Sequence, residues 1–178
     1  MRRIVVTSFL SLDGVMENPG WTFPYWNDEI AQFKGDETND ADALLLGRVT
    51  YQGFAAAWPT STDEGAPYMN SVRKYVVSAT LDTAAWNNSV IVKGDVVAEI
   101  TRLKHEPGRD LLVYGSATLV QTLMRHDLVD SYRLLVYPVI LGQGIRLFQD
   151  GVQATLRLVQ AQATSSGVAA LIYEPVRT

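Results

Sequence analysis

The chain has 178 residues, of which 47% are hydrophobic and 19% charged, and its formal net charge is −4 at pH 7. This length suits one compact domain over residues 1–178, and the composition excludes a wholly disordered chain. The acidic balance excludes a broad basic surface, so we expect binding neither to nucleic acid nor to a membrane.

The absence of cysteine excludes disulfides and thiolate metal sites, and it fits a reducing cytoplasmic compartment. The two histidines, His105 and His126, lie in charged stretches typical of exposed helix ends, where the helix dipole favours a cation. We therefore expect no metal site. No apolar run approaches the roughly 18 residues that a membrane span requires.

The first half of the chain alternates apolar strands with helical patterns. Apolar and β-branched residues predict a strand over Arg3–Phe9, and a loop rich in glycine and proline follows from Ser11 to Trp26. A loop of this length is usually functional. The next predicted elements are a helix over Asn27–Asn39, a short strand over Ala43–Leu46 and a helix over Arg48–Ala57.

The second half continues the alternation and then changes. It predicts strands over Arg73–Ser78, Ser89–Val92, Leu111–Tyr114 and Val129–Leu141, the last interrupted at Pro138, and helices over Val96–His105 and Ser116–His126. Two final runs, Thr155–Thr164 and Val168–Val176, flank a turn and predict an antiparallel hairpin. The pattern predicts an α/β fold with a mostly parallel central sheet, flanked by helices and ending in this C-terminal hairpin.

Two glycines stand where an apolar strand gives way to a helix, in the segments Leu46–Thr50 and Tyr114–Thr118. Free backbone N–H groups and the positive end of each helix favour a phosphate there. Two such sites on one sheet edge suit a dinucleotide. The candidate ligands are Gly47, Arg48, Thr50, Gly115, Ser116, Ala117 and Thr118.

Ordinary structural roles compete with this interpretation. Ser116 and Thr118 also suit helix capping, and Arg48 also suits a surface ion pair. Spacing alone slightly favours these ordinary roles. Ser78 and Thr80, directly after a strand, have hydroxyls that suit an adenosine 2′-phosphate together with Arg48. Taken alone, this segment is better explained by an ordinary Ser/Thr turn.

Asp13 is the first candidate for an acid, because it follows a buried strand in a loop that also holds tryptophans, an environment that raises a carboxyl pKa. By default it is a turn residue. Asp28 and Glu29 are secondary candidates, since the helix dipole favours early acids whatever their function. No nucleophile elbow, phosphate-binding P-loop or complete G-x-G-x-x-G motif is present.

Five segments in order resemble the dihydrofolate reductase superfamily, and most closely its branch related to the C-terminal reductase domain of the riboflavin biosynthesis enzyme RibD. They are Ser11–Gly14, Leu45–Tyr51, Tyr75–Ser78, Val113–Ser116 and Leu128–Arg133 followed by Pro138–Phe148. The resemblance covers nearly the whole chain. It implies a reductase that transfers hydride from NADPH to a flat nitrogen heterocycle, with the cofactor lying across the carboxyl ends of the central strands.

The resemblance also implies roles for individual residues. Gly47, Arg48 and Thr50 would hold cofactor phosphate, the segment Gly115–Thr118 would hold the pyrophosphate side, and Ser78 and Thr80 the adenosine end. It also implies that Asp13 and Gly14 lie near the nicotinamide and the substrate, under a lid that contains Trp21 and Trp26. The catalytic candidates are Asp13, Glu29 and Trp26.

Departures from the family pattern leave the substrate open. Folate reductases usually carry Gly-Gly where this chain has Gly115-Ser116, and an acid where it has Trp26. Riboflavin-pathway reductases usually have lysine where Val15 stands. We expect an aminouracil-type pyrimidine or a pterin or dihydrofolate-type substrate. The alternatives are a non-catalytic NADP-binding dimeric module and a structural dimer protein without cofactor. The apolar C-terminal strands predict a homodimer.

Overall fold

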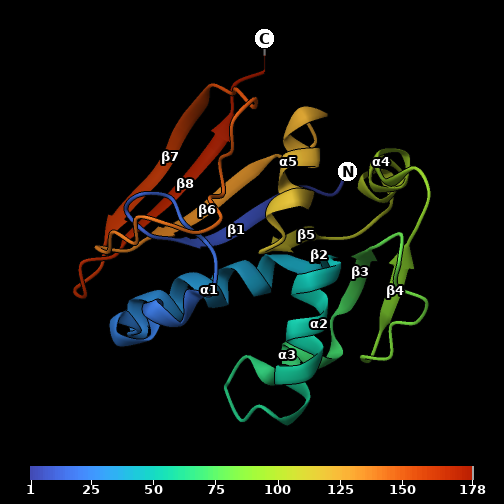
Figure 1. Cartoon of the computed structure of the whole chain (residues 1–178), viewed down its shortest axis with the longest axis horizontal. Helices are drawn as coiled ribbons and strands as arrows, with labels where there is room; N and C mark the ends of the chain where they lie inside the picture. Colours follow the sequence, from blue (N-terminus) through green and yellow to red (C-terminus); the bar gives the residue numbers. More distant parts are fainter. Residues whose placement is uncertain (178) are drawn as a thin grey trace.

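One eight-stranded sheet runs through the molecule in the order β4-β3-β2-β5-β1-β6-β8-β7 (Figure 1). The computed structural model describes residues 1–177. The first six strands in this order are parallel, whereas β8 runs antiparallel to both β6 and β7. The strands are β1 (Ile4–Leu10), β2 (Ala41–Gly47), β3 (Arg73–Val77), β4 (Ser89–Val92), β5 (Asp110–Tyr114), β6 (Ser131–Val136), β7 (Leu156–Ala163) and β8 (Ala169–Pro175). The predicted α/β fold, with its parallel sheet and C-terminal hairpin, is confirmed.

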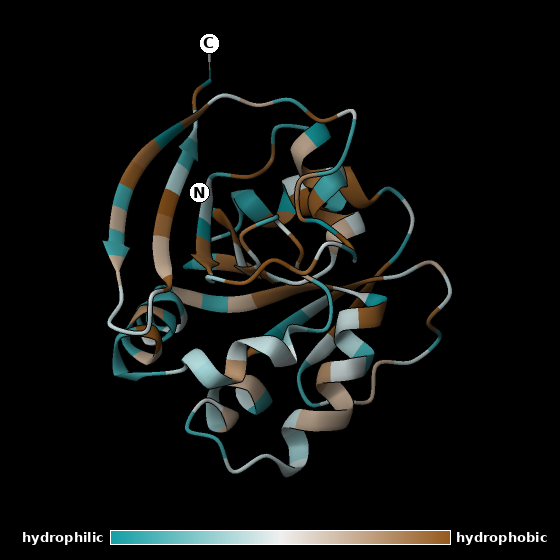
Figure 2. Ribbon diagram, turned by 60° about the vertical axis from the view of Figure 1, so that its left-hand side comes forward, coloured by the Kyte–Doolittle hydropathy of each residue, from teal (hydrophilic) through white to brown (hydrophobic). Residues whose placement is uncertain are grey.

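Helices cover both faces of this sheet. The helices are α1 (Asp28–Asp40), α2 (Arg48–Ala57), α3 (Ala66–Ser71), α4 (Val96–His105) and α5 (Ala117–Arg125), with short 3₁₀ helices η1 (Pro19–Tyr25) and η2 (Trp58–Thr60). Alternate residues of β2 show the two layers, because Leu44 packs with Tyr51 of α2, whereas Leu45 packs in the core cluster of α4 and α5. Figure 2 shows brown, hydrophobic segments concentrated in the strands. Within residues 1–177, no helix is long and apolar enough to cross a membrane.

The expected strand over Val129–Leu141 is shorter in the structure, where β6 spans Ser131–Val136. Pro138 follows closely, and proline has no N–H to donate to a sheet. Beyond the strand, the Tyr137 amide still donates to the Leu10 carbonyl (2.8 Å) before the chain turns away. The prediction also missed the helix α3, whose six residues are too few to show a helical period.

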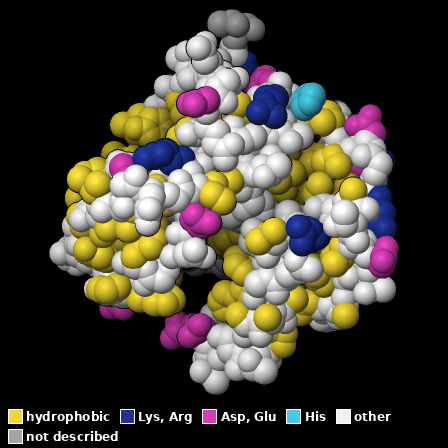
Figure 3. Space-filling view, in the orientation of Figure 1, with side chains coloured by type: hydrophobic (Ala, Val, Ile, Leu, Met, Phe, Trp, Pro, Cys, Tyr) yellow, Lys and Arg dark blue, Asp and Glu magenta, His cyan; other side chains and the backbone are white. Residues whose placement is uncertain are grey.

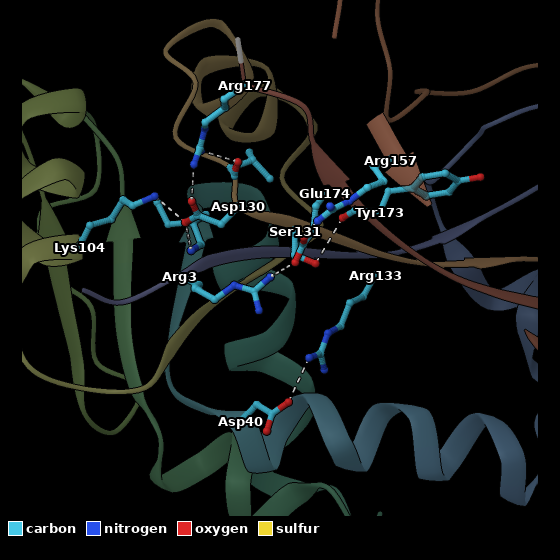
Figure 4. Close-up of polar contacts among 12 residues, drawn as sticks. Arg3, Asp40, Lys104, Asp130, Ser131, Arg133, Arg157, Tyr173, Glu174 and Arg177 are labelled. Atoms are coloured by element: carbon cyan, nitrogen blue, oxygen red, sulfur yellow. Dashed lines mark hydrogen bonds and ion pairs between the residues drawn. The ribbon is translucent and has the colours of Figure 1, made fainter. Parts of the chain in front are cut away.

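Ion pairs fix the amino-terminal edge of the sheet around β6 (Figure 4). Asp130, just before β6, accepts from Lys104 at the end of α4 and from Arg177 (3.1 Å). Arg133 of β6 reaches across the sheet edge to Asp40 at the end of α1 (3.0 Å). These contacts tie both helical layers to the same edge. The opposite, carboxyl-terminal edge carries the candidate site.

Candidate functional site

The strands β2 and β5 are neighbours, although β3 and β4 lie between them in the sequence. The connections that follow these two strands run in opposite directions along the sheet. From β2 the chain continues through α2 to β3, toward one edge, and from β5 it continues through α5 to β6, toward the other edge. In open α/β sheets, ligands bind at the carboxyl end of such a pair, where the strand order reverses. The two predicted glycine segments meet at this place.

Direct contacts join the two segments. The Gly47 amide donates to the Ser116 hydroxyl oxygen (2.7 Å), and that hydroxyl lies 2.9 Å from the Thr50 hydroxyl. A Cβ on Gly47 would lie 3.0 Å from Ser116 Oγ, and one on Gly115 would lie 2.9 Å from Thr50 Oγ1. A side chain at either position would crowd these hydroxyls, so the packing favours glycine at both. We name these four residues, Gly47, Thr50, Gly115 and Ser116, the glycine cradle.

The helices that start at the glycine cradle have no side-chain cap. Among residues 1–177, no side chain caps the first turn of α2 or α5, although Ser116 stands at the N-cap of α5 in a left-handed conformation (φ 62°). By contrast, Asn27 caps α1 by accepting from the Ile30 amide, and Asp95 caps α4. The first N–H groups of α2 and α5, including those of Ala117 and Thr118, therefore lack side-chain partners.

Two uncapped helix N-termini beside glycines are suited to the phosphates of a dinucleotide, because each offers N–H donors and a positive dipole end. The Ser116 hydroxyl is engaged with Gly47 and Thr50 rather than with its own helix, so the capping interpretation of Ser116 is wrong. The absence of a Cβ at Gly47 and Gly115 lets the backbone come close to a ligand. The residues present fit a pyrophosphate group.

The residues expected at the adenosine end lie on the same edge, one strand further along. Gly47 of β2 pairs with Val77 of β3. Arg48 and Ser78, which directly follow these two residues, therefore leave neighbouring strands at the same edge of the sheet. Arg48 is exposed and its guanidinium donates to Gln52 of the same helix (3.0 Å). The Ser78 hydroxyl accepts from the amides of Thr80 (3.2 Å) and Leu81, which forms a turn of the ordinary Ser/Thr kind.

Asp13 holds two loops together beyond the end of β1. Its carboxylate accepts from the Ser11 hydroxyl (2.6 Å) and from the amides of Leu141 (3.1 Å) and Gly142 (2.8 Å). The Ser11 hydrogen bond, followed by the two backbone donors, lowers the pKa of Asp13 to about 2. The carboxyl group is therefore ionised at neutral pH and has no proton to give. The geometry does not support the expected role of Asp13 as a proton donor.

The neighbouring Gly14 has a positive φ of 83°, and its carbonyl accepts from the Leu147 amide (3.1 Å). The same two loops form an isolated bridge between Val15 and Arg146. Asp13 and Gly14 thus belong to a clamp between the loop after β1 and the loop after β6. A cavity of about 340 Å³ opens beside this clamp, lined in part by Trp21, Glu17 and Leu141.

Glu29 and Trp26 lie apart from the glycine cradle. The Glu29 carboxylate accepts from the amide (2.7 Å) and hydroxyl (2.6 Å) of Ser165 in the turn between β7 and β8. These hydrogen bonds lower its pKa, so Glu29 fastens α1 to the hairpin. Trp26 is 51% exposed, whereas Trp21 packs edge-on against Tyr137 with ring centroids 5.5 Å apart. The geometry gives no support to Glu29 as the acid.

The structure reveals a polar cluster that the sequence reasoning missed. Thr7 of β1 and Lys34 and Glu37 of α1 meet between the helix and the sheet, and Glu37 is fully buried. In the sequence, a lysine and a glutamate three positions apart are typical of an exposed helical pair. One signal was available in the sequence, because Lys34 follows the apolar residue Ile30 by four positions, and residues four apart lie on the same side of a helix.

A family model and a curated relative match nearly the whole chain. The family model of the RibD C-terminal domain matches residues 2–170. The uncharacterized protein YyaP of Bacillus subtilis (strain 168) is 30% identical over 178 residues, covering 97% of this chain and 94% of that protein.

Two solved structures share the fold. A putative riboflavin biosynthesis protein from Shewanella sp. PV-4 has a TM-score of 0.75 and 18% identity, covering 98% of this chain and 99% of its own. The dihydrofolate reductase of Enterococcus faecalis, solved with NADP(H), has a TM-score of 0.67 and 12% identity, covering 98% and 97% of the two chains. At these identities the structures show the fold alone.

Proposed function

Because the chain belongs to the RibD C-terminal domain family, we propose that it is an NADPH-dependent reductase acting on a flat nitrogen heterocycle. The observation that supports this most is the glycine cradle, where two uncapped helix N-termini meet at the reversal point of the sheet. In this proposal the reduced nicotinamide supplies a hydride, and the protein supplies binding and orientation.

The first N–H groups of α2 and α5 would bind the pyrophosphate, with the Thr50 and Ser116 hydroxyls beside it. Arg48 donates to Gln52 and has no ion-pair partner within residues 1–177, and it lies next to the strand that leads to Ser78. A charged donor at this position suits the 2′-phosphate that distinguishes NADPH from NADH. The clamp around Asp13 would keep the loop after β1 closed over the nicotinamide end.

The alternative is a non-catalytic NADP-binding dimeric module. It would use the same cradle, so binding alone does not separate the two. The discriminating property is oxidation of bound NADPH when a heterocycle is supplied. A structural protein without cofactor would bind neither NADPH nor NADH.

The test uses the purified full chain. NADPH and NADH are titrated separately by protein fluorescence, and the oxidation of NADPH is then followed optically with a panel of oxopyrimidines and dihydropterins. We expect saturable binding with preference for NADPH, and oxidation that depends on one class of heterocycle. Binding without oxidation across the panel would favour the module, and the absence of any binding would contradict both.

We also propose that two chains associate through β7. This strand is an edge of the sheet, and every residue in it after Leu156 is exposed. Leu158 and Val159 are 51% and 53% exposed, and unpaired apolar edges promote association. Pairing of two copies across a two-fold axis covers both edges at once.

A further inference from the structure

The helix α1 rests on the sheet partly through charged groups. The Lys34 ammonium donates to the Thr7 hydroxyl (2.8 Å) and to the Glu37 carboxylate (2.5 Å), and the Thr7 hydroxyl lies 2.9 Å from both carboxylate oxygens. We name Thr7, Lys34 and Glu37 the polar floor. Arg133 of β6 is the other charged group close enough to influence Lys34, and it is paired with Asp40.

The needs of the fold do not explain the polar floor. The Glu37 side chain is 0% exposed and that of Lys34 is 13% exposed. A buried ion pair costs desolvation that its attraction seldom exceeds, and apolar residues of similar size stabilise such a place as well or better. Charged groups buried beside a ligand site, on the other hand, are typical of functional centres.

The polar floor lies next to the glycine cradle. Thr7 pairs in register with Tyr114, the last residue of β5, and Gly115 of the cradle comes next. The Lys34 ammonium lies 4.6 Å from the centre of the Tyr114 ring, and Phe54 of α2 packs against the same ring at 6.0 Å. Figure 3 shows the surface notched between α1 and the region of α2 and α3. Aromatic rings and a cation therefore meet beside the cradle.

The Lys34 ammonium has two oxygen partners among residues 1–177, and the centres of the Tyr114 and Phe9 rings lie 4.6 Å and 5.3 Å from its nitrogen. An ammonium carries three N–H groups, and two of those of Lys34 bond to Thr7 and Glu37. Lys34 is also the member of the floor pair that reaches the surface, because Glu37 is fully enclosed. Burial lowers the pKa of Lys34, while the Glu37 carboxylate opposes this shift and favours the charged ammonium.

We propose that the Lys34 ammonium binds a ring carbonyl oxygen of the heterocycle, with Glu37 and Thr7 as positioning residues that hold it. The inference rests on the proposed function and assigns the residue that recognises the oxo group of its pyrimidine or pterin substrate. An ammonium donates more strongly to a carbonyl oxygen than to the ring nitrogen of an aminopyrimidine, and it repels a ring that is protonated. The site therefore selects oxo rings over amino rings.

The test compares two probes on the full chain, with NADPH present. Diaminouracil carries two ring carbonyls, and tetraaminopyrimidine carries amino groups in their place. We expect calorimetric titration to show that the wild-type protein binds diaminouracil about tenfold or more tightly than tetraaminopyrimidine. The double variant Lys34→Met with Glu37→Gln removes the cation without leaving a buried unpaired carboxylate, and it should lose this preference.

The matched control is Arg102→Met with Glu99→Gln, which removes an exposed pair of the same spacing on α4. It should keep the wild-type preference, and NADPH affinity should be the same in all three proteins. A preference that persists in the Lys34 and Glu37 variant would overturn the inference, as would a wild-type protein that binds neither probe. If the preference for diaminouracil depends on Lys34 but the wild-type protein does not bind or oxidise NADPH, the result contradicts the proposed function and leaves this inference standing.

Discussion

The Gly47 amide donates to the Ser116 hydroxyl across 2.7 Å, although 69 positions of sequence separate the two residues. This bond holds the starts of α2 and α5 together at the edge of the sheet, and these helices cover opposite faces. It leaves little room for a side chain at position 47, because a Cβ there would lie 3.0 Å from the Ser116 hydroxyl oxygen. The candidate phosphate site therefore depends on a contact that substitution can break.

Gly47→Ala should separate the two helix starts. Its new Cβ would lie 3.0 Å from Ser116 Oγ and 3.1 Å from Ser116 Cβ, so one segment has to move. Overpacking of this kind costs about 1 to 3 kcal/mol. We expect the free energy of unfolding to fall by that amount in urea titrations, and the affinity for NADPH to fall about tenfold or more, because the N–H donors no longer converge.

Gly53→Ala serves as the control, since Gly53 lies in the same helix with open space around the new Cβ. Replacing glycine by alanine within a helix usually stabilises by roughly 0.5 to 1 kcal/mol. This variant should therefore unfold at slightly higher urea concentration and bind NADPH like the wild type. Equal NADPH affinity in the Gly47 and Gly53 variants would contradict the cradle as the phosphate site.

Arg48→Ala should weaken NADPH binding by about ten- to a hundredfold and leave NADH binding nearly unchanged. The reason is that only NADPH carries the 2′-phosphate, and a charge-assisted contact is lost. Separate fluorescence titrations with the two cofactors measure the difference. Arg125→Ala, at the far end of α5, controls for the loss of one positive charge. If the Arg48 variant loses affinity for NADPH and NADH equally, Arg48 does not bind the 2′-phosphate.

Asp13→Asn should lower stability rather than remove a proton donor. The carboxylate pKa is lowered to about 2 in the folded protein, so its contribution is present above about pH 4 and is lost as the pH falls toward 2. An amide has one oxygen for the Ser11, Leu141 and Gly142 donors, which leaves the clamp incompletely bonded.

Thermal midpoints of the wild type and the Asp13→Asn variant, measured between pH 7 and pH 3, test this expectation. Their difference should be greatest at neutral pH and shrink as the solution becomes acidic. Asp82→Asn is the control, because the Asp82 side chain is 96% exposed. If the Asp13→Asn variant is as stable as the wild type at neutral pH but has a strongly reduced turnover, the result supports Asp13 as the proton donor and contradicts this expectation.

Light scattering should give a mass near twice the 19.7 kDa of one chain at micromolar concentration. Leu158→Glu places a charge on the exposed face of β7 and should produce monomers, because like charges would then meet across the two-fold axis. Val90→Glu places the same charge on β4, the opposite edge of the sheet, and should leave the mass unchanged. A wild-type protein that stays at 19.7 kDa as its concentration rises excludes the dimer.

Local patterns made much of the fold predictable. The helices over Arg48–Ala57 and Val96–His105 have the expected ends, because glycine or an acid before each one and apolar spacing within it are signals from neighbouring residues. The glycine exits of β2 and β5 were visible for the same reason. Their adjacency was not, since strand order depends on contacts between distant segments.

The acids show the limit of local reasoning. Asp13 and Glu29 stand at positions that suit acid chemistry. Ser11 is a local partner of Asp13, but the Leu141 amide lies 128 positions from Asp13 and the Ser165 amide lies 136 positions from Glu29. Hydrogen-bond partners that lie far away in the sequence cannot be recognised from the residues next to the acid. For Lys34 and Glu37 the local pattern was misleading. A lysine and a glutamate three positions apart are usually exposed, but here β1 encloses the pair.

The place of β5 between β2 and β1 also has a consequence for biosynthesis. A nascent chain makes β1 to β4 before β5, and β1 has no neighbour in the sheet until Asp110–Tyr114 emerges. Until then the facing edges of β1 and β2 expose unpaired backbone groups, which attract foreign strands. Insertion of β5 closes this gap and creates the cradle in one event. Ribosome-bound chains that end before β5 should therefore depend on chaperones, and binding competence should appear abruptly once that strand is available.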